Sequence, residues 1–447
     1  MTRPLYITNT LSNKKELFTP YKPGNVALYV CGITPYDYAH LGHGRCYVTF
    51  DILYRLLTLL GYQVTYCRNF TDIDDKLLDR AQHTLGDPFK YRQIADQFIA
   101  AYEKDMEALN CLKPTYEPRV TDNIPDIIAF IERLIAAGNA YVADGDVYFS
   151  IESFPEYGKL SKRNIADLKV GARVQPNDKK RNPLDFALWK SEEGEHFWKS
   201  PWGYGRPGWH IECSVLGYKY LGQVIDIHGG GMDLIFPHHE NEVAQSEAIL
   251  GIPVVRYWLH NAFVNINKEK MSKSLGNFMT LHQTFQTIDP MILRFYYAQH
   301  YYRAPLEFTQ TDLEGVAKSY KRLCALFESV QADASRIQNS PIASRMLDYL
   351  LDDLNTSGMF GVIFEEFDTL RADESQAQAV KALLQQVMGL PLVAIPEKEV
   401  AITPEIQQLI DEREQARVRK DFKRADEIRQ QLTDLGIQIH DHKSAKK

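Results

Sequence analysis

The stretch that decides the fold is Cys31-Gly-Ile-Thr-Pro-Tyr-Asp-Tyr-Ala-His-Leu-Gly-His43. It follows a short apolar run, residues 26–30, which predicts a buried strand. Apolar residues then recur at helical spacing from Tyr47 to Leu60, and residues 63–67 alternate in the manner of a second strand. The stretch is therefore predicted to be the loop of a strand–loop–helix–strand unit. Such a loop lies at the carboxyl end of a strand, where open parallel sheets bind ligands.

Two histidines, His40 and His43, stand at the start of the predicted helix. The free N–H groups and the positive dipole end of a helix N-terminus attract phosphate. Side chains three residues apart lie on one face, and Gly42 between them lets a ligand approach the backbone. The segment predicts a phosphate-binding turn, although taken alone it also fits two ordinary surface histidines.

The composition of the whole chain limits the class of protein. A length of 447 residues predicts about two to four domains. Hydrophobic residues at 45% and charged residues at 24% are typical of soluble globular proteins. The net charge of −7 neither indicates nor excludes a nucleic-acid partner, because a binding face depends on local charge.

The N-terminus and the cysteines indicate the compartment. The chain starts without an apolar signal core, and no run reaches membrane-spanning length. Six cysteines are scattered without the tight spacing of a disulfide framework. We therefore expect a cytoplasmic protein with no membrane partner.

The first part of the chain has the pattern of a doubly wound α/β domain, but it lacks the G-x-G-x-x-G turn of dinucleotide-binding folds. Thr71 follows the second strand and is placed to line the ligand crevice. The acidic residues Asp72, Asp74 and Asp75 are better explained as helix caps than as a metal cluster. Residues 114–205 interrupt the alternating strand–helix pattern and are predicted to be an insertion.

Four potential metal ligands fall at strand ends or helix starts on one edge of the predicted sheet: Cys31, Cys213, His238 and Glu242. Cys213 belongs to a helix predicted to begin near Trp209. His238 and Glu242 are four residues apart in another helix and so face the same way. Zinc accepts thiolate, imidazole and carboxylate ligands in tetrahedral sets. Without a compact C-x-x-C, buried core thiols and a surface helix pair remain alternatives.

A lysine-rich stretch follows the last predicted strand of this domain. Lys270 and Lys273 are separated by small and flexible residues. Two mobile ammonium groups can stabilise the charge that develops on a leaving pyrophosphate. The alternative is a solvated lysine loop without a ligand.

Together these motifs are specific. His40-Leu-Gly-His43 matches the HIGH motif and Lys270-Met-Ser-Lys-Ser274 matches the KMSKS motif, in the order and separation of class I aminoacyl-tRNA synthetases. Residues 31–37, 209–214 and 226–242 closely resemble the cysteinyl-tRNA synthetase family. This resemblance extends over residues 1–437.

The resemblance implies the members of the site. In that family one zinc ion per chain is held by residues that correspond to Cys31, Cys213, His238 and Glu242, and the substrate thiol binds the zinc. The amino acid is expected beside Gly32, Thr71, Trp209 and Asp233. ATP, with Mg²⁺, is expected near Thr34, His40, Gly42, His43, His228 and Lys273.

The resemblance also implies the reaction. The carboxylate of L-cysteine attacks the α-phosphate of ATP, giving cysteinyl-adenylate and pyrophosphate, and the 2′-OH of the terminal ribose of tRNA(Cys) then takes the acyl group. Because no side chain needs to act as a nucleophile, positioning and charge stabilisation carry the first step. The residues expected to supply them are His40, His43, Lys270 and Lys273. We expect the chain to act as a monomer.

We predict three parts. Residues 1–310 form a Rossmann-like catalytic domain with a doubly wound parallel sheet and the insertion, residues 311–395 form an α-helical bundle, and residues 396–447 form a small anticodon-binding module. Residues 411–447 carry a net charge of +2, whereas the whole chain carries −7. The chain departs from the family pattern at its end, because it lacks the longer tail with a tryptophan and arginines that the family often has.

Two other functions share parts of this pattern. A ligase that joins cysteine to an amino-sugar acceptor would share the catalytic domain but would need no anticodon-binding module. A catalytically inactive paralogue, acting as a zinc-dependent or RNA-binding module, would not need the two histidines and two lysines of the motifs. The intact motifs and the C-terminal helices favour the synthetase.

Overall fold

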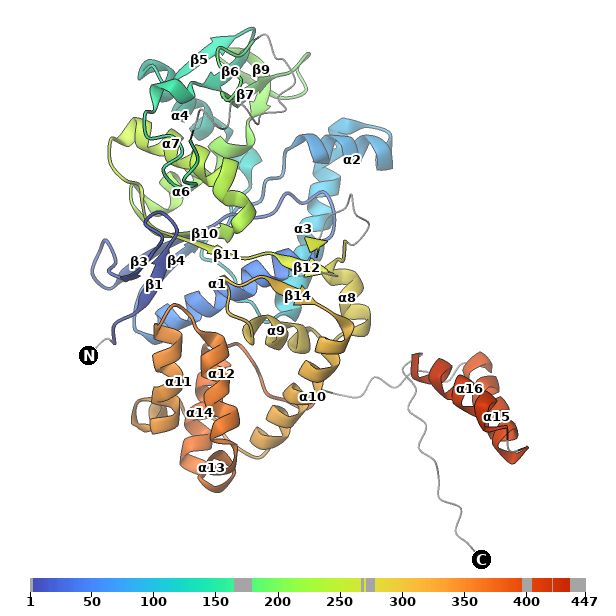
Figure 1. The fold of residues 1–447 in the computed structure, drawn as a ribbon. Helices are drawn as coiled ribbons and strands as arrows, with labels where there is room; N and C mark the ends of the chain where they lie inside the picture. The colour runs from blue at the N-terminus through green and yellow to red at the C-terminus, as the bar shows by residue number, and fades with distance from the viewer. Residues whose placement is uncertain are drawn as a thin grey trace, which may run out of the picture. The chain divides into compact units, whose positions relative to one another are not determined.

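The computed structural model describes residues 3–164, 179–266, 269–270, 278–395, 404–419 and 421–434. The chain divides into two compact units, Met1–Val393 and Ala394–Lys447. The first unit contains the sheets of the described residues, and the second contains a pair of helices (Figure 1). The limits of the three predicted domains stay predictions.

The core of the first unit is a four-stranded sheet in the order β11-β10-β3-β4. Each neighbouring pair is parallel, so the carboxyl ends of all four strands meet at one edge. The strands bury most of their side chains, as expected for a parallel sheet that is covered on both faces. Their bounds are β3 (Asn25–Val30), β4 (Gln63–Cys67), β10 (Ile225–Gly231) and β11 (Val255–Asn261).

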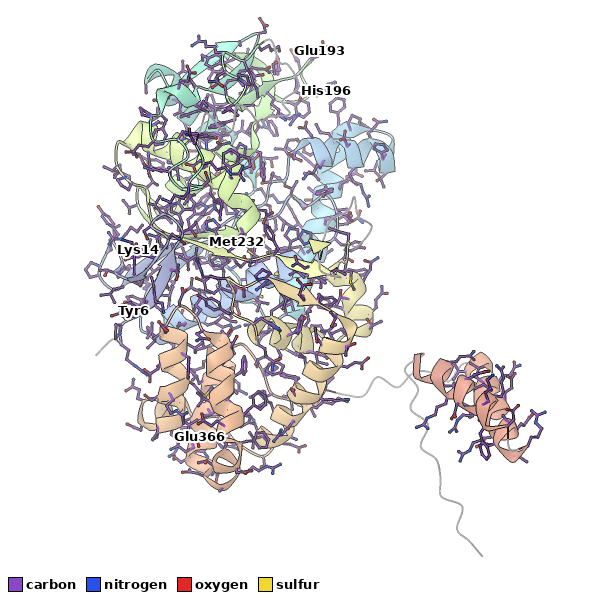
Figure 2. All side chains as sticks on the ribbon, in the orientation of Figure 1. Tyr6, Lys14, Glu193, His196, Met232 and Glu366 are labelled. Atoms are coloured by element: carbon purple, nitrogen blue, oxygen red, sulfur yellow. The ribbon has the colours of Figure 1, made fainter. Side chains whose placement is uncertain are left out.

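Helices cover both faces of this sheet, which is the predicted doubly wound arrangement. Helix α1 (Leu41–Leu59) packs on one face, and α6 (Trp209–Leu221), with α7 (Glu240–Leu250) beside it, packs on the other (Figure 1). In α1, Leu53, Leu56 and Leu57 are fully buried at the spacing of one helix face. Side chains fill the space between the sheet and its helices (Figure 2). The prediction that a helix begins near Trp209 is confirmed.

Between β4 and α6, the described residues form the helices α2, α3 and α4 and a second sheet. This sheet is antiparallel, has five strands in the order β5-β6-β7-β9-β8, and lies beyond α6 and α7 (Figure 1). The helices are α2 (Asp75–Leu85), α3 (Tyr91–Ala108) and α4 (Ile124–Ala136). The strands are β5 (Ala140–Ala143), β6 (Asp146–Phe149), β7 (Phe186–Ser191), β8 (Trp198–Ser200) and β9 (Gly203–Pro207).

The acidic run after β4 stabilises local structure. The Asp74 carboxylate accepts a backbone N–H of the first turn of α2 at 3.0 Å, which confirms the predicted capping at this residue. Asp72 instead accepts the backbone N–H and the hydroxyl of Thr121, at 3.0 and 2.6 Å. Asp75 forms an ion pair with Lys190 of β7 at 2.6 Å. The run therefore holds α2 to neighbouring segments.

A small sheet and a helical bundle complete the first unit. The sheet has three strands in the order β13-β12-β14, and a two-stranded hairpin lies near the N-terminus. The strands are β12 (Val264–Ile266), β13 (Glu269–Lys270), β14 (Leu306–Phe308), β1 (Tyr6–Asn9) and β2 (Lys14–Leu17). The helices are α8 (Leu281–Thr287), α9 (Pro290–Ala298), α10 (Gln310–Phe327), α11 (Pro341–Leu351), α12 (Thr356–Glu365), α13 (Phe367–Ala372) and α14 (Glu374–Gln386).

The second unit contains two helices among its described residues, α15 (Pro404–Val418) and α16 (Phe422–Asp434). They pack through Ile406, Ile428 and Leu432. At their junction Val418 and Phe422 are 83% and 62% exposed. Among the residues that the structure describes, no helix has the length and hydropathy of a membrane span.

Candidate active site and metal centre

A cavity of about 360 Å³ opens at the carboxyl edge of the parallel sheet. It lies where the loop after β3, the first turn of α1, the start of α6 and the turn after β10 meet. The predicted site residues that line it are Cys31, Gly32, Thr34, His40, Gly42, His43, Trp209 and Asp233. The parallel sheet thus collects, at one opening, residues that lie far apart in the sequence.

Five predicted site residues within the described part of the chain do not line this cavity. Cys213, His238, Glu242, His228 and Thr71 are buried. Lys270 ends β13, where its backbone pairs with that of Asn265 of β12. Lys273 lies outside the described residues, so its place beside the nucleotide stays a prediction.

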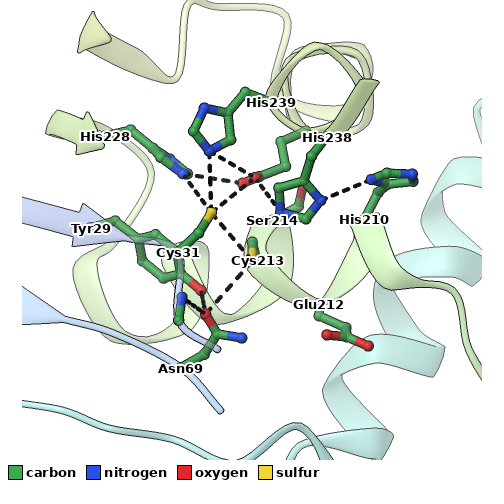
Figure 3. A network of polar contacts seen from close by, with 12 residues as sticks. Tyr29, Cys31, Asn69, His210, Glu212, Cys213, Ser214, His228, His238 and His239 are labelled. Atoms are coloured by element: carbon green, nitrogen blue, oxygen red, sulfur yellow. Dashed lines mark hydrogen bonds and ion pairs between the residues drawn. The ribbon is translucent and has the colours of Figure 1, made fainter. Parts of the chain in front are cut away.

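The four predicted metal ligands converge. Their ligand atoms all lie within 4.8 Å of one another, and all four side chains are buried. The Cys31 sulfur is 3.8 Å from the Cys213 sulfur and 3.6 Å from Oε1 of Glu242. His238 Nε2 lies 3.1 Å from the same carboxylate oxygen (Figure 3). Two sulfurs, an imidazole and a carboxylate form a donor set that fits a tetrahedrally coordinated cation.

The electrostatics of this cluster also fit a cation. Burial raises the pKa of the Cys31 thiol and of the Glu242 carboxyl well above their usual values. The hydrogen bond from Cys31 lowers the pKa of the Cys213 thiol to about 7. Buried anionic groups are costly unless they are paired or bound to a metal. A cation at this point would stabilise the deprotonated forms of all three groups.

A second possible ligand set overlaps the first. It keeps Cys31 and Glu242 and replaces the other two ligands with His228 and His239. Nε2 of His239 and Nε2 of His228 lie 3.2 and 3.5 Å from the Cys31 sulfur (Figure 3). His228, which we predicted beside ATP, is thus placed against the metal cluster, and its contact with ATP stays a prediction. The sequence signal for His239 was the adjacent histidine pair, but a pattern alone could not show that both rings face Cys31.

Asn69, which sequence reasoning missed, connects the predicted amino-acid contacts. Its side-chain oxygen accepts the backbone N–H of Gly32 at 3.0 Å and the hydroxyl of Tyr29 at 3.1 Å. Its side-chain nitrogen donates to the Thr71 hydroxyl at 3.2 Å, and that hydroxyl donates to Glu212 at 2.7 Å. A Cβ at Gly32 would collide with the backbone of Asn69, so only glycine fits there.

The two histidines of α1 form a reciprocal cap. Nδ1 of His40 accepts the backbone N–H of His43 at 3.3 Å, and Nδ1 of His43 accepts the backbone N–H of His40 at 3.2 Å. The rings stack with their centroids 3.7 Å apart. Burial, and then the charges of His40 and Lys76, lower the pKa of His43, so the His43 ring is neutral at neutral pH. Because Nδ1 is an acceptor in both rings, a neutral ring carries its proton on Nε2.

Two further cavity residues escaped the sequence analysis. Lys76, in the first turn of α2, lines the cavity, and its ammonium lies 5.3 Å from the ring centre of Tyr36. Phe278 lines it as well and meets the His40 ring edge to face at 5.3 Å. Neither belongs to a recognisable motif, so only the fold shows that they share the cavity with the two histidines.

The fold is that of a class I aminoacyl-tRNA synthetase. Residues 17–318 match the family described as tRNA synthetases class I (C) catalytic domain. Mycobacterium tuberculosis methionyl-tRNA synthetase, solved with methionyl-adenylate, is similar in fold, with a TM-score of 0.57 at 14% identity over 82% of this chain and 92% of that chain. A putative arginyl-tRNA synthetase from Campylobacter jejuni has a TM-score of 0.53 at 14% identity, over 85% and 95% of the two chains. The predicted fold class is therefore confirmed.

Relatives over nearly the whole chain define the family more narrowly. Residues 399–446 match the family described as Cysteinyl-tRNA ligase anticodon binding domain. Cysteine–tRNA ligases from Trichlorobacter lovleyi and Geobacter sulfurreducens are 47% and 46% identical, each over 98% of this chain and 98% of the relative. That of Caldicellulosiruptor saccharolyticus is 47% identical over 97% of both. The chain belongs to the cysteine–tRNA ligase family, as the sequence motifs indicated.

Proposed function

We propose that this chain activates L-cysteine with Mg²⁺ and ATP and transfers it to the terminal ribose of tRNA(Cys). One observation carries the choice of amino acid: Cys31 belongs to the buried metal-ligand cluster and also lines the cavity. A metal ion in that cluster would therefore be within reach of a side chain bound in the cavity. Among the amino acids, cysteine offers the softest side-chain ligand.

The proposed metal is one Zn²⁺ per chain, held by Cys31, Cys213, His238 and Glu242. When bound, it supplies a Lewis acid that holds a thiol as thiolate at neutral pH. The residues around it orient the substrate. Trp209 is 41% exposed at the cavity and stacks on His238 with ring centroids 4.4 Å apart, so it is placed to pack beside the substrate side chain. The Asp233 carboxylate lines the same cavity and is suited to the α-ammonium group.

In the activation step, an oxygen of the cysteine carboxylate attacks the α-phosphorus. The new P–O bond forms as the bond from that phosphorus to the bridging oxygen of pyrophosphate breaks. Because Nδ1 accepts a backbone N–H in both rings, His40 and His43 can each donate from Nε2 to phosphate oxygens. Thr34 and Gly42 allow the phosphates to approach the N-terminus of α1. Lys270 and Lys273 are assigned to the departing pyrophosphate.

In the transfer step, the 2′-OH of the terminal ribose attacks the activated carbonyl and AMP leaves. The α15–α16 pair is the proposed anticodon contact. Phe422 and Val418 are exposed at its junction, and Arg419, Lys423 and Arg424 lie on either side of Phe422 in the sequence. An exposed aromatic ring among cations is suited to stack on an unpaired base.

We further propose a cytoplasmic monomer. Both steps are assigned to residues of one chain. All six cysteines lie within the described residues, and all are free, which is the usual state in a reducing compartment.

Two assays in sequence test the proposal. Cysteine-dependent pyrophosphate exchange tests activation, and charging of tRNA(Cys) tests transfer. A ligase for an amino-sugar acceptor would show exchange without charging, and an inactive paralogue would show neither. The match of residues 399–446 to an anticodon-binding family is the feature that favours tRNA over an amino sugar.

A further inference from the structure

Arg45, two residues after His43, carries a charge in a place where a charge is costly. Its side chain belongs to α1 and is only 1% exposed. Burial lowers the pKa of its guanidinium to about 10, which still leaves it protonated at neutral pH. Within the part of the chain that the structure describes, no carboxylate pairs with it. A buried cation needs strong compensation, so the partners of Arg45 indicate what it does.

The compensation comes from backbone carbonyl groups. Nη1 of Arg45 donates to the carbonyl oxygens of Ala262 and Phe263 at 3.1 and 2.7 Å. Nη2 lies 3.3 Å from the carbonyl oxygens of Tyr301 and Tyr302, and it also donates to that of Ala304. The planar, forked guanidinium is the side chain that can reach two separate groups of acceptors in this way. Lysine, with a single nitrogen, cannot span them.

These carbonyl groups belong to the two segments that enter the small sheet. Residues 262–263 join β11 to β12, and residues 301–304 lead from α9 into β14. Strands β12 and β14 are parallel neighbours, with Val264 opposite Leu306. One guanidinium therefore hydrogen-bonds the segments that precede both strands and so holds them against α1. The same helix carries His43 and is capped by His40.

The fastened backbone is a wall of the active-site cavity. Residues 261–264 line it, together with His40, His43 and Phe278. The metal-ligand cluster borders the cavity at Cys31, which follows a different strand, β3. The wall next to Arg45 is thus built on β11 and β12, whereas the amino-acid contacts are built on β3, β4, α6 and β10.

We propose that Arg45 is a positioning residue for the nucleotide. It fixes the wall at residues 261–264 relative to the two histidines, so that the space for ATP has its correct width before ATP binds. This inference rests on the proposed function for the identity of the nucleotide. It predicts that a substitution at Arg45 weakens ATP binding far more than cysteine binding, because the cysteine contacts are attached to other elements.

The chain offers a matched control. Arg294, on α9, is also fully buried and also donates to backbone carbonyls, at 2.7 Å to Met388 and 2.7 Å to Leu109. It differs in having an ion pair with Asp51 at 2.5 Å, and none of its hydrogen-bond partners among the described residues lines the cavity. Arg294→Lys therefore has a comparable effect on a buried hydrogen-bond network while leaving the nucleotide wall in place.

The test is calorimetric titration of the full chain with Mg²⁺ and α,β-methylene-ATP, whose bridging carbon prevents the activation step. We expect Arg45→Lys to weaken binding of this analogue by about tenfold or more, since small displacements of positioning groups have large effects. Arg294→Lys should change it by less than about twofold, although both variants lower the melting temperature. In pyrophosphate exchange, Arg45→Lys should raise KM for ATP and leave KM for cysteine nearly unchanged.

Arg45→Gln provides a second variant. It removes the buried charge, so it is less prone to unfold than Arg45→Lys, which keeps one. Folded Arg45→Lys or Arg45→Gln protein that binds the analogue as the unsubstituted chain does would overturn the proposal. Equal weakening in Arg294→Lys would overturn it too, because the effect would then be one of general stability. Absence of exchange in the unsubstituted chain would instead refute the proposed function, and the difference in analogue binding between the Arg45 and Arg294 variants would still test the role of Arg45.

Discussion

Replacement of Asn69 by alanine tests whether the buried hydrogen-bond network shapes the amino-acid site. The Asn69 side chain is 1% exposed and makes bonds of 3.0, 3.1 and 3.2 Å to Gly32, Tyr29 and Thr71. In Asn69→Ala the Gly32 N–H and the Tyr29 hydroxyl lose their acceptor. Each buried donor without a partner costs about 1–3 kcal/mol, so the free energy of unfolding should fall by about 2–6 kcal/mol. Thr71 would also lose a restraint on its orientation.

The change in KM for cysteine should be larger than lost stability alone would cause. Because Gly32 and Thr71 are proposed to contact the amino acid, KM for cysteine in pyrophosphate exchange should rise about tenfold, while KM for ATP stays within about twofold.

Asn123→Ala is the control. Asn123 is equally buried and donates to the Arg119 carbonyl at 2.7 Å, but it does not line the cavity. Urea unfolding measures both losses of stability. An Asn69 variant that is destabilised but keeps its KM for cysteine would refute a role of the network in substrate binding.

Three further outcomes follow from the site and the fold. Lys273→Ala should slow pyrophosphate exchange by about a hundredfold with cysteine binding nearly intact, as expected for charge stabilisation in the transition state; lost cysteine affinity at an unchanged rate would contradict this role. Phe422→Ala should raise KM for tRNA(Cys) about tenfold through lost stacking and leave exchange unchanged, and unimpaired charging at low tRNA concentration would argue against the contact. Burial raises the pKa of Asp105 to about 7, so the folded chain keeps a proton that the unfolded chain releases, and stability should fall as pH rises from about 4 to about 7. Asp105→Asn should remove this decline and stabilise the chain by about 1–2 kcal/mol at pH 8, whereas melting curves with the same pH dependence in both proteins would refute the assignment.

The sequence predicted those parts of the fold that have a strong local signal. The strand at 26–30, the helix with Leu53, Leu56 and Leu57 on one face, and the strand at 63–67 follow from periodicity and correspond to β3, α1 and β4. The sequence predicted a single strand over residues 258–266, where the structure has the end of β11 and then β12. The three-residue strand β14 is too short for any period to be recognised. Its pairing with β12 is set by contacts distant in sequence, among them those of Arg45.

The site was predictable where a motif marks it. His40, His43 and the four ligand residues were found because their spacing resembles a known family, and the parallel sheet then explains why they meet. Asn69 could not be found in this way, because its partners Gly32 and Tyr29 come from a neighbouring strand and are fixed only by strand register. An asparagine after a strand carries no signal of its own. The same limit applies to His239, since the sequence does not show that both rings of the pair reach the metal-ligand cluster.

We propose that a metal ion held by the ligand cluster, which borders the cavity at Cys31, recognises the substrate thiol. An apolar pocket separates cysteine from serine by only about a hundredfold, because the two differ by one atom. A thiol has a pKa of about 8.5 and is readily held as thiolate by a metal, whereas a hydroxyl is a poorer ligand for a site that already contains two sulfurs. Absorption spectroscopy of the cobalt(II)-substituted protein tests this directly. Cysteine should add a thiolate-to-metal charge-transfer band and serine should add none, and an unchanged spectrum at saturating cysteine would contradict the account.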